Sequence, residues 1–466
     1  MNTHPHSPSF VNGRVAFWYR DQPVTVRRPP LDADTSVDVA IVGGGYTGLW
    51  SAYYLKRAQP DLRVVVLEAE FAGYGASGRN GGWLRAEPPG QLRRYAKTHG
   101  WLAAVALQQE MFRSVDEVIA VARAEGIDAE IVKHGMLHIA TNPAQHARLR
   151  QLTRDLRRQG WGEDDLVDLS LREVVDRILV PGVRGAQFSP HGARLQPAKL
   201  VRGLAAAVER LGVTIHEDTR VEQILPRRAV TGRGTVHAQY VLLAVEGFTA
   251  GLPGHHRDLL PMNSSMIVTE PLPPDAWREI GWAGAELLGD VAHSFAYLQR
   301  TPDGRIVVGG RGIPYRFGSR TDNDGSTDRR TRHQLHTQLV RYFPAAAQVP
   351  IAHTWSGVLG VPRDWTAGVS VDQETGLCRA GGYVGHGVTS TNLAGRTVAD
   401  LILRRDTPLV RLPWVDRPVR RWEPEPLRWI GARSLYAAYR AADRAEHVGG
   451  PRTSRLARAA DLISGR

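Results

Sequence analysis

The hydrophobic pattern in the N-terminal part of the chain alternates between two kinds of element. Val37–Val42 is a run of mostly β-branched and apolar residues, which predicts a buried parallel strand. Tyr46–Arg57 then predicts a helix, and Arg63–Leu67 predicts a second strand. A strand, a turn, a helix and a strand in this order are typical of the nucleotide-binding half of a doubly wound sheet.

The pattern changes after Gly82. Trp101–Glu125 has apolar residues at helical spacing, and Ile131–Ala140 predicts a strand. Between residues 253 and 351, short apolar strands alternate with turns, which indicates a large antiparallel sheet. A predicted helix at Ala198–Leu211 returns to the first pattern. We therefore expect a second domain that is inserted into the first.

The turn after the first strand carries the motif G-x-G-x-x-G at Gly43, Gly45 and Gly48. The first glycine permits a tight bend, the second lets a pyrophosphate approach the backbone, and the third lets the helix pack close to the strand. The unpaired N–H groups at the helix N-terminus then meet the phosphates. Glu68 follows where a carboxylate accepts hydrogen bonds from ribose hydroxyls and repels a 2′-phosphate. These features predict a dinucleotide site.

Two further glycine-rich segments favour FAD over NAD. The segment 73–82 offers flexible backbone that suits a ligand longer than NAD, although a mobile surface loop is the alternative. Late in the chain, the turn 385–388 leads into a predicted helix at Thr389–Leu403. The N-terminus of that helix would place partial positive charge beside a flavin, where negative charge grows on reduction. His386 is the best candidate for a residue at the isoalloxazine, and a histidine that merely belongs to the turn is the alternative.

Three stretches of sequence resemble the D-amino-acid oxidase superfamily of FAD enzymes, in the branch similar to γ-glutamylputrescine oxidoreductase and to glycine and sarcosine oxidases. They are VAIVGGGYTGLWSAYYL, LEAEFAGYGASGRNGG and GGYVGHGVTSTNLAGRTVADLI, in the order typical of the family. The resemblance implies a fold of class α/β + β. A discontinuous, Rossmann-like FAD-binding domain would carry an inserted substrate domain built on a large antiparallel sheet.

On this basis we expect four parts. Residues 1–36 form an N-terminal arm, residues 37–95, 180–252 and 352–412 the FAD-binding domain, residues 96–179 and 253–351 the substrate domain, and residues 413–466 a C-terminal helical tail. Phe17, Trp18 and Tyr19 are the expected packing anchors of the arm. The tail contains an arginine-rich helix at about Pro426–His447, which either caps the domain or contacts a membrane surface or a partner.

The expected cofactor-binding residues come from the glycine-rich segments and from strand ends. They are Gly43, Gly45, Tyr46, Thr47, Gly48, Glu68, Ala69, Gly75, Ala76, Ser77, Arg79, Asn80, Gly81, Gly82, Val221, Gly247, Gly385, His386, Gly387, Val388 and Thr389. The resemblance implies that Val221 holds the adenine through its backbone. The role of the family's glycine carries over less securely to Gly247, because the family usually has Ala-Thr-Gly here and this chain has Ala244, Val245, Glu246 and Gly247. The expected catalytic residues are His386, Arg311 and Trp355.

These features together indicate an FAD-dependent oxidoreductase that oxidises the C–N bond of an amine or amino acid. The chain has no second G-x-G-x-x-G for a nicotinamide domain, so the electrons would come from the organic substrate. A hydride would pass to flavin N5, and the resulting imine would hydrolyse. O2 or a quinone would then accept the electrons. The alternatives are a membrane-associated dehydrogenase that reduces a quinone and, less favoured, an RNA-modifying flavoprotein, because no nucleic-acid-binding module is evident.

Composition sets the outer limits. The 466 residues, 42% of them hydrophobic, suffice for two or three domains with sizeable cores. The formal net charge is +12 and all but four of the 59 basic residues are arginine, which would attract anionic substrates, RNA or lipid headgroups. The motifs of P-loop, serine-hydrolase and HExxH enzymes are absent, and the 17 histidines show no metal-ligand spacing, so no metal is expected.

Cysteine content and the N-terminal segment predict a cytoplasmic protein. Cys378 is the single cysteine, which excludes an internal disulfide and favours a reducing compartment. The first residues contain no apolar leader, and no later run has the length of a spanning helix. Family members that tether their flavin use a cysteine before the late strand or a histidine near Arg79 and Asn80. Because this chain has neither, we expect FAD to be bound without a covalent bond.

Two departures from the family pattern bear on chemistry. Val358 and Leu359 stand where glycine oxidase-like enzymes place an arginine that clamps the substrate α-carboxylate, so we expect an amine whose reacting carbon carries no carboxylate. A distant anionic group would then meet Arg300, Arg311 or Arg363, unless one of them has taken over the clamp. Val307 also stands where sarcosine oxidases place an O2-activating lysine, which predicts slow reoxidation by O2 unless His386 or Arg311 supplies the charge.

Overall fold

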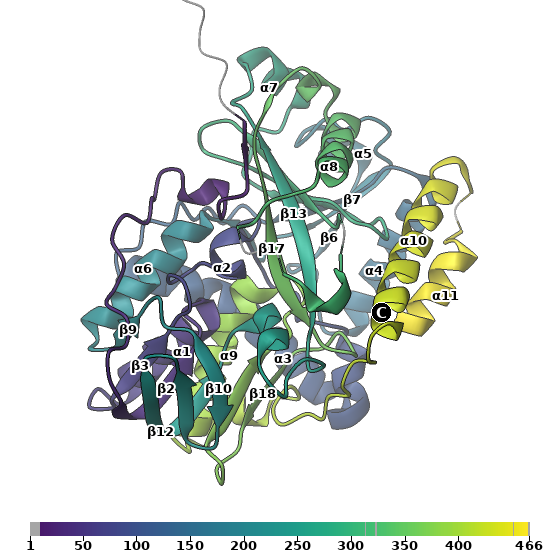
Figure 1. Ribbon diagram of the computed structural model, residues 1–466. Helices are drawn as coiled ribbons and strands as arrows, with labels where there is room; N and C mark the ends of the chain where they lie inside the picture. The colour runs from purple at the N-terminus through teal and green to yellow at the C-terminus, as the bar shows by residue number, and fades with distance from the viewer. Residues whose placement is uncertain (1–9, 313, 322–323, 451, 465–466) are drawn as a thin grey trace, which may run out of the picture.

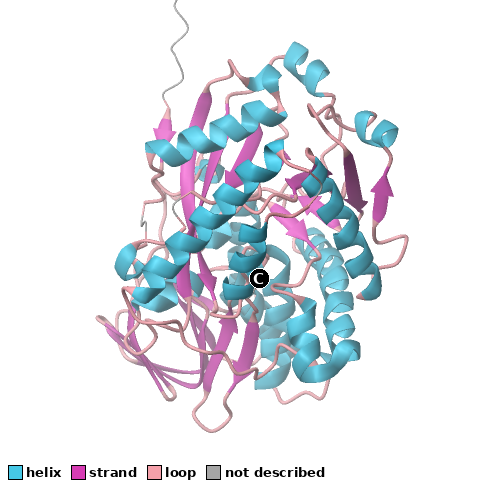
Figure 2. Cartoon of the chain, turned by 90° about the vertical axis from the view of Figure 1, so that its right-hand side faces the viewer, coloured by secondary structure: helices cyan, strands magenta, loops and turns pink. Residues whose placement is uncertain are grey.

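The computed structural model describes residues 10–312, 314–321, 324–450 and 452–464, so the first nine residues of the expected arm and the last two of the tail lie outside it. The described chain is built on two large sheets, one low and one high in Figure 1, with helices around both. Figure 2 shows the molecule from its right-hand side, where the C-terminal helices lie in front. This two-sheet architecture is the one expected from the sequence pattern.

The lower sheet has a parallel centre and an antiparallel edge. Its strands are β2 (Thr35–Val42), β3 (Val64–Leu67), β9 (Thr214–His216), β10 (Val221–Leu225), β11 (Arg228–Thr231), β12 (Gly234–Leu243), β18 (Gly368–Val371) and β19 (Leu377–Gly381). β2, β3, β9, β12 and β19 are parallel neighbours, and β10 and β11 fold back on β12. Parallel strands that are covered on both faces read as continuous apolar runs, which is why the sequence revealed β2 and β3 directly.

Three helices of this sheet form one core with it. α1 (Tyr46–Ala58), α6 (Pro197–Arg210) and α9 (Gly387–Ile402) bury their apolar faces together. A Cβ on Gly395 would lie 2.7 Å from the backbone of Trp50, so α9 packs directly against α1. The N-termini of α1 and α9 therefore come to the same end of the sheet, although their sequences are far apart.

The upper sheet has nine strands. They are β1 (Val11–Asn12), β5 (Met136–Ala140), β6 (Val167–Leu169), β7 (Gly185–Ser189), β13 (Leu260–Thr269), β14 (Leu287–Asp290), β15 (Tyr297–Arg300), β16 (Ile306–Gly310) and β17 (Ile351–Val361). A short two-stranded sheet of β4 (Trp83–Arg85) and β8 (Gly192–Arg194) lies apart from both. β13 and β17 are the long antiparallel pair at the centre of Figure 1.

The change of sheet does not coincide with the expected domain boundaries. Boundaries at residues 180 and 352 would place β7 and β17 in the FAD-binding domain, and the structure pairs both with the upper sheet instead. β17 continues the ladder of β13 over ten partners, and β1 of the N-terminal arm joins its other edge. Local patterning could not reveal these pairings, because their partners are distant in sequence.

The remaining helices lie around both sheets, and the longest of them packs against α9 in the core of the lower sheet. They are α2 (Ala76–Arg79), α3 (Leu92–Ala124), α4 (Pro143–Arg158), α5 (Leu171–Val175), α7 (Pro274–Ile280), α8 (Arg329–Tyr342), α10 (Leu427–Val448) and α11 (Arg455–Ser464). The helix expected at Trp101 begins earlier, and Gly100 interrupts it with φ of +80°. No helix in the described part of the chain combines the length and apolar character that crossing a bilayer requires.

Candidate active site

A cavity of about 670 Å³ lies between the two sheets, at the end where α1 and α9 begin. Gly43 and Gly45 after β2 line it on one side, and Ser264 and Met266 of β13 line it on the other. Ser264 and Met266 share a face of their strand because side chains alternate along β structure. The cavity therefore brings the glycine motif of the lower sheet to the inner face of the upper sheet.

The first glycine turn has the backbone that a pyrophosphate requires. Gly43 has φ of +111°, and a Cβ there would lie 2.7 Å from the Ala244 carbonyl oxygen. A Cβ on Gly48 would lie 2.1 Å from the Gly43 carbonyl oxygen. Gly45 precedes α1, and the Tyr46 N–H donates to the Ser77 hydroxyl at 2.8 Å, so Ser77 of the second glycine-rich segment caps the helix beside the cavity. The turn fits the phosphates of a dinucleotide.

Glu68 lies where the second strand ends and lines the cavity. Its carboxylate accepts hydrogen bonds from the backbone N–H of Gly44 at 2.7 Å and of Glu70 at 3.0 Å. Burial nevertheless raises the pKa of Glu68 to about 7. The two N–H donors hold the carboxyl group against the glycine turn, at the position expected to meet the ribose hydroxyls.

The N-terminal arm packs against the second glycine-rich segment, residues 73–82, on the side away from the cavity. The Trp18 indole donates to the Asn80 carbonyl oxygen at 2.8 Å, and the Tyr19 hydroxyl donates to the Gly73 carbonyl oxygen at 2.9 Å. A Cβ on Gly78 would come within 2.1 Å of the Tyr19 hydroxyl. Trp18 and Tyr19 are thus packing anchors, as expected, and what they anchor is the wall of the cavity.

Trp355 supports the same segment from β17. Its indole is fully buried and donates to the Arg79 carbonyl oxygen at 2.9 Å. The ring packs against Phe17 and Trp18, with ring centroids 6.2 and 5.8 Å away. Trp355 does not belong to the residues that line the cavity, so the structure places it beneath the wall rather than in contact with a ligand.

His386 faces Arg85 instead of the cavity. Its Nε2 lies 2.9 Å from Nη2 of Arg85, and its Nδ1 lies 3.1 Å from the Glu87 carbonyl oxygen. Because a guanidinium only donates and a carbonyl only accepts, Nδ1 carries the proton and Nε2 accepts. Burial, and then the charge of Arg85, hold the pKa of His386 well below its usual value. A neutral imidazole therefore fixes a cationic side chain that lines the cavity.

Arg85 and Trp83 are residues that the sequence did not single out. They are two residues apart on β4, so both point to the cavity. The Trp83 ring meets the Tyr297 ring edge-on at 5.8 Å, and the Tyr297 hydroxyl lies 3.0 Å from Ser264 Oγ. With Phe295 these rings form an aromatic wall on the upper-sheet side of the cavity. The alternation of side chains along β4 was the feature of the sequence that could have identified Trp83 and Arg85.

Arg311 follows β16 and lines the cavity close to Gly385. Its Nη1 is buried, and no described residue accepts a hydrogen bond from it. The other two candidate arginines are engaged elsewhere. Arg300 donates to the Trp282 carbonyl oxygen, and Arg363 contacts both carboxylate oxygens of Glu423 at 3.0 Å. Of the three, Arg311 is the one at the cavity.

Glu246 connects the walls of the cavity. It has φ of +47°, and its carboxylate accepts hydrogen bonds from the N–H groups of Gly360, Gly382 and Tyr383 at 2.6, 2.8 and 3.1 Å. Burial raises its pKa to about 7 although these donors oppose the shift. One side chain thus ties β17 to the turn before α9. Gly247 itself lies against Val358 and does not line the cavity.

The cavity collects most of the expected cofactor residues. Those that line it are Gly43, Gly45, Tyr46, Thr47, Glu68, Ala69, Gly75, Ala76, Ser77, Arg79, Asn80, Gly81, Val221, Gly385, Gly387 and Val388. Gly48, Gly82, Gly247, His386 and Thr389 lie behind this lining. Thr389 accepts a hydrogen bond from the Arg85 N–H at 3.0 Å, so it supports a cavity residue. The expected set therefore comes together around one cavity, although its members are far apart in the sequence.

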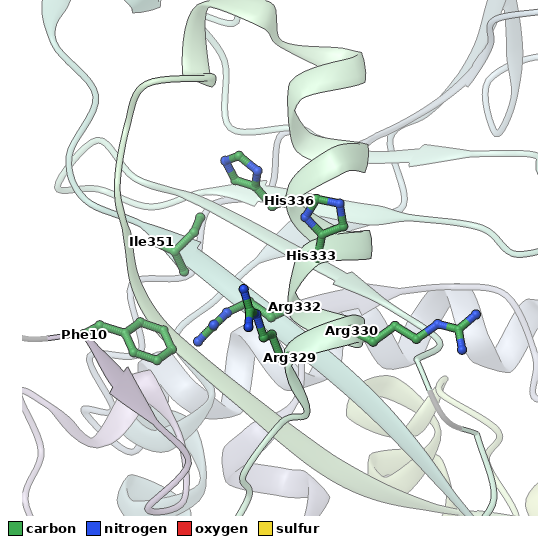
Figure 3. Close-up of a pocket in the computed structure, with 7 residues that line it drawn as sticks. All are labelled: Phe10, Arg329, Arg330, Arg332, His333, His336 and Ile351. Carbon is green, nitrogen blue, oxygen red and sulfur yellow. The ribbon is translucent and has the colours of Figure 1, made fainter.

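A larger depression of about 910 Å³ lies elsewhere on the surface, beside α8. The residues that line it are labelled in Figure 3: Phe10, Arg329, Arg330, Arg332, His333, His336 and Ile351. It contains no glycine turn and no buried polar side chain. Its chemistry is that of a cationic surface, so the smaller cavity is the candidate active site.

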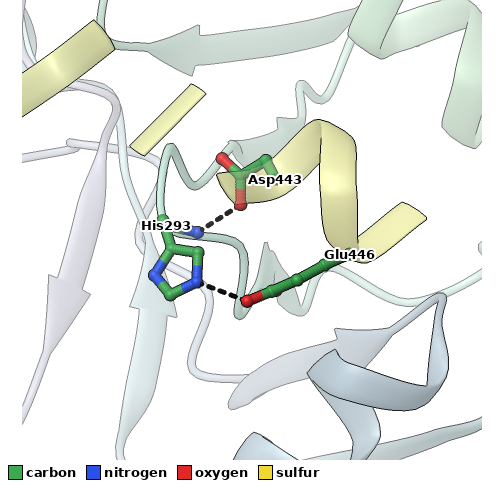
Figure 4. A group of neighbouring side chains, drawn as sticks. All are labelled: His293, Asp443 and Glu446. Atoms are coloured by element: carbon green, nitrogen blue, oxygen red, sulfur yellow. Dashed lines mark hydrogen bonds and ion pairs between the residues drawn. The ribbon is translucent and has the colours of Figure 1, made fainter. Parts of the chain in front are cut away.

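One group of side chains has the separation of metal ligands, which the sequence spacing did not indicate. His293 Nε2 lies 2.9 Å from Glu446, and Asp443 accepts a hydrogen bond from the His293 N–H at 2.8 Å (Figure 4). Arg148 and the Ser454 N–H also donate to Glu446. These donors already occupy the carboxylate oxygens, so the group joins α10 to the upper sheet as an ion-pair network.

Comparisons with known proteins agree with this geometry. A family model described as FAD dependent oxidoreductase matches residues 38–401. The γ-glutamylputrescine oxidoreductase of Escherichia coli (strain K12) is 32% identical over 382 residues, which cover 80% of this chain and 85% of that protein. The glycine oxidase of Geobacillus kaustophilus (strain HTA426) is 25% identical over 381 residues, which cover 79% of this chain and 94% of that protein.

Solved structures share the fold. The glycine oxidase of Geobacillus kaustophilus superposes with a TM-score of 0.66 at 22% identity and covers 82% of this chain and all of that chain. The L-proline dehydrogenase of P. horikoshii gives a TM-score of 0.66 at 19% identity, and the match covers 81% of this chain and 96% of that chain. At these identities the likeness shows the architecture, an α/β dinucleotide-binding domain with a second domain on a large sheet.

Proposed function

Since this chain belongs to the family of FAD-dependent oxidoreductases, we propose that it oxidises an amine at the carbon next to the nitrogen. FAD, when bound, supplies the acceptor for the two electrons and the hydrogen of that C–H bond, and the imine that remains hydrolyses in water. The 32% identity to a γ-glutamylputrescine oxidoreductase supports an amine as substrate. The prediction that FAD is the cofactor is confirmed.

The residues of the cavity fit FAD. The glycine turn and the start of α1 would take the pyrophosphate, Glu68 the ribose, and the backbone of Val221 the adenine side. The segment 73–82 would wrap the flavin half of FAD. The indoles of Trp18 and Trp355 donate hydrogen bonds to carbonyl oxygens of this segment. Those two indoles satisfy carbonyl oxygens from the rear, so they hold the backbone of this segment in place against the cavity.

The proposed substrate class rests on Arg311. A guanidinium nitrogen that is buried and unpaired costs free energy, and an anionic group on the substrate recovers that cost. Val358 and Leu359 line the cavity where an α-carboxylate clamp would be expected, and neither can bind an anion. We therefore assign Arg311 to an anionic group at a distance from the reacting carbon. The substrate is an amine without an α-carboxylate and with a remote acidic group.

Arg85 completes the anion site. It lines the same cavity, and His386 and the Thr389 hydroxyl hold it in place. The charges of Arg85 and Arg311 both act on His386 and on Tyr297, so the two guanidiniums flank the same region. His386 acts here as a positioning residue, and Arg85 and Arg311 are the groups that contact substrate. Trp355 positions the loop.

The cavity also favours the reactive form of the amine. Burial beside the aromatic wall disfavours an ammonium ion, so the substrate nitrogen binds deprotonated and keeps its lone pair. The lone pair then forms the C=N bond as the hydride leaves the α-carbon, so no dedicated base is required. The aromatic wall of Trp83, Phe295 and Tyr297 excludes water from the reacting carbon.

The electron acceptor is O2 or a quinone. Val307 is buried in β16, against Met266 and Trp355, where the oxygen-activating lysine of sarcosine oxidases was expected to align. No lysine lines the cavity among the described residues. Since His386 is held neutral, Arg311 and Arg85 are the charges available to promote reaction with O2. Parallel assays of reoxidation by O2 and by a soluble quinone separate the two acceptors.

Anaerobic bleaching of the bound flavin tests the function. A panel would pair each α-amino acid with its decarboxylated amine, and would include amines with and without a remote carboxylate. We expect the remote-carboxylate amines to bleach the flavin fastest. A simple α-amino acid that bleaches it at least as efficiently as its matched amine would contradict the substrate assignment, while bleaching by NADH alone would contradict amine oxidation.

A further inference from the structure

Helix α10 carries a stripe of arginines on the face that it turns away from the protein. Arg433 and Arg444 are exposed and Arg440 is half-buried, while Ala442 on the opposite face is buried. Residues four and seven apart share a helix face, so the three guanidiniums lie along one line. Figure 1 shows α10 at the edge of the molecule, beside α11.

These arginines have no acidic partners. No carboxylate among the described residues pairs with Arg433, Arg440 or Arg444, or with Arg330 on the neighbouring helix α8. Burial, and then the charges of Arg330, Arg433 and Arg444, lower the pKa of Arg440. The four guanidiniums therefore share one surface and repel one another. Like charge concentrated in this way is relieved by an anionic partner.

Apolar side chains adjoin the arginines at the start of the helix. Leu427 is 60% exposed, Ile430 is 50% exposed and Phe317 is 47% exposed. The Trp429 ring meets Phe317 at 6.1 Å, and the Arg433 guanidinium lies 5.1 Å from the Trp429 ring centroid. Aliphatic and aromatic side chains next to arginines on one exposed face are typical of helices that lie in a membrane interface.

The neighbouring helix α8 extends the cationic surface. Arg329, Arg330 and Arg332 line the depression beside Phe10 (Figure 3), and the charge of Arg330 also acts on Arg440 of α10. The Arg332 guanidinium lies 4.6 Å from the Phe10 ring centroid, so an aromatic ring again accompanies an arginine. The cationic area thus spans two helices, which suits an extended anionic surface better than a single small anion.

We propose that this α8–α10 surface docks the protein on an anionic phospholipid bilayer. A second copy of the chain is a poor occupant, because a symmetric contact would bring the arginines against the same arginines. A nucleic acid would use the positive charge, but it offers nothing to Leu427 and Ile430. Phospholipid headgroups pair with the arginines while the acyl boundary receives the apolar residues.

Co-sedimentation of the FAD-loaded protein with vesicles tests the proposal. Vesicles of phosphatidylglycerol and phosphatidylcholine are compared with pure phosphatidylcholine, at low and at raised ionic strength. The variant R433Q/R440Q/R444Q removes the stripe. The matched control R57Q/R172Q/R233Q removes the same charge from exposed arginines elsewhere. Flavin content and turnover with a soluble acceptor show that each variant is folded.

We expect salt-sensitive binding to the anionic vesicles alone. Each surface arginine contributes about fivefold to such binding, so the triple variant should bind on the order of a hundredfold more weakly. The control variant should bind like the natural chain. Equal binding by both variants or no binding by the natural chain would overturn the proposal. So would displacement from the vesicles by RNA whose phosphate concentration equals that of the lipid. The outcome is independent of which amine the enzyme oxidises.

Discussion

The Nε2 atom of His386 accepts a hydrogen bond from the guanidinium of Arg85 at 2.9 Å, across 301 positions of sequence. The contact joins the turn before α9 to the strand β4, which follows the second glycine-rich segment. It gives the late glycine motif a role that the motif alone does not reveal. His386 orients a cation that lines the active-site cavity.

Replacement of His386 should separate positioning from chemistry. H386L removes the acceptor for Arg85, so we expect KM for a carboxylate-bearing amine to rise about tenfold with a smaller change in kcat. H386Q can accept from Arg85 and donate to the Glu87 carbonyl oxygen, and it should restore most of the affinity. Equal defects in both variants, or a loss of kcat alone, would assign His386 a direct part in the chemistry.

Replacement of Arg311 should change substrate preference. R311M removes the buried guanidinium and should lower kcat/KM for the remote-carboxylate amine by about a hundredfold, which corresponds to about 3 kcal/mol for a buried charge pair. The matched amine without a carboxylate should be affected little. Steady-state kinetics with the two amines measure the difference. A uniform loss on both would show that Arg311 acts on the flavin or the fold.

Ionisation of Glu246 should appear in the stability of the apoprotein. Its pKa in the folded chain is about 7, above the value of about 4.3 in an unfolded chain. The folded state therefore binds the proton more tightly, and the stability that this provides is present below about pH 4.5 and is lost as the pH rises through about 7. E246Q cannot ionise and escapes this loss.

Melting temperatures across this pH range check the effect. The difference between E246Q and the natural chain should grow in favour of E246Q from about pH 4.5 to about pH 7 and then stay constant. E222Q, at an exposed glutamate that also lines the cavity, is the matched control and should show no such trend. A difference that shrinks as the pH rises would mean that the three N–H donors outweigh the burial of Glu246.

FAD should leave the denatured polypeptide on acid precipitation. Cys378 is buried in β19, 1% exposed, and it does not line the cavity, so its sulfur has no access to the flavin. Burial also raises the pKa of its thiol to about 12, which removes the nucleophilic thiolate. Flavin absorbance in the supernatant measures release, and C378A should retain normal flavin content. Flavin that stays with the precipitate would contradict non-covalent binding.

Local patterns predicted the glycine turn and the strands on either side of it. Gly43, Gly45 and Gly48 act within a few residues of one another, and the apolar runs of β2 and β3 are continuous because both faces of the sheet are covered. The partners of Trp355 and His386 could not be predicted in the same way. Both residues were expected to face the ligand, and long-range contacts turn them toward Arg79 and Arg85.

The substrate half of the site was harder to predict for the same reason. Trp83 and Tyr297 meet only because β4 and the upper sheet close over one cavity. Glu246 stood out in the sequence as a departure from the family pattern, but its bonds to Gly360 and Gly382 need the folded sheet. Arg311 was identified because a charged residue directly follows an apolar strand that should face the flavin.

Anaerobic reduction of the bound flavin by a deuterated substrate tests the central claim most directly. The account predicts that a remote-carboxylate amine bleaches the flavin in the absence of O2. Deuterium on the carbon next to nitrogen should slow this bleaching several-fold, because that C–H bond breaks in the step that reduces the flavin. If no amine or amino acid bleaches the flavin, or if bleaching depends on a nicotinamide donor instead, the assignment of this protein as an amine oxidoreductase is wrong.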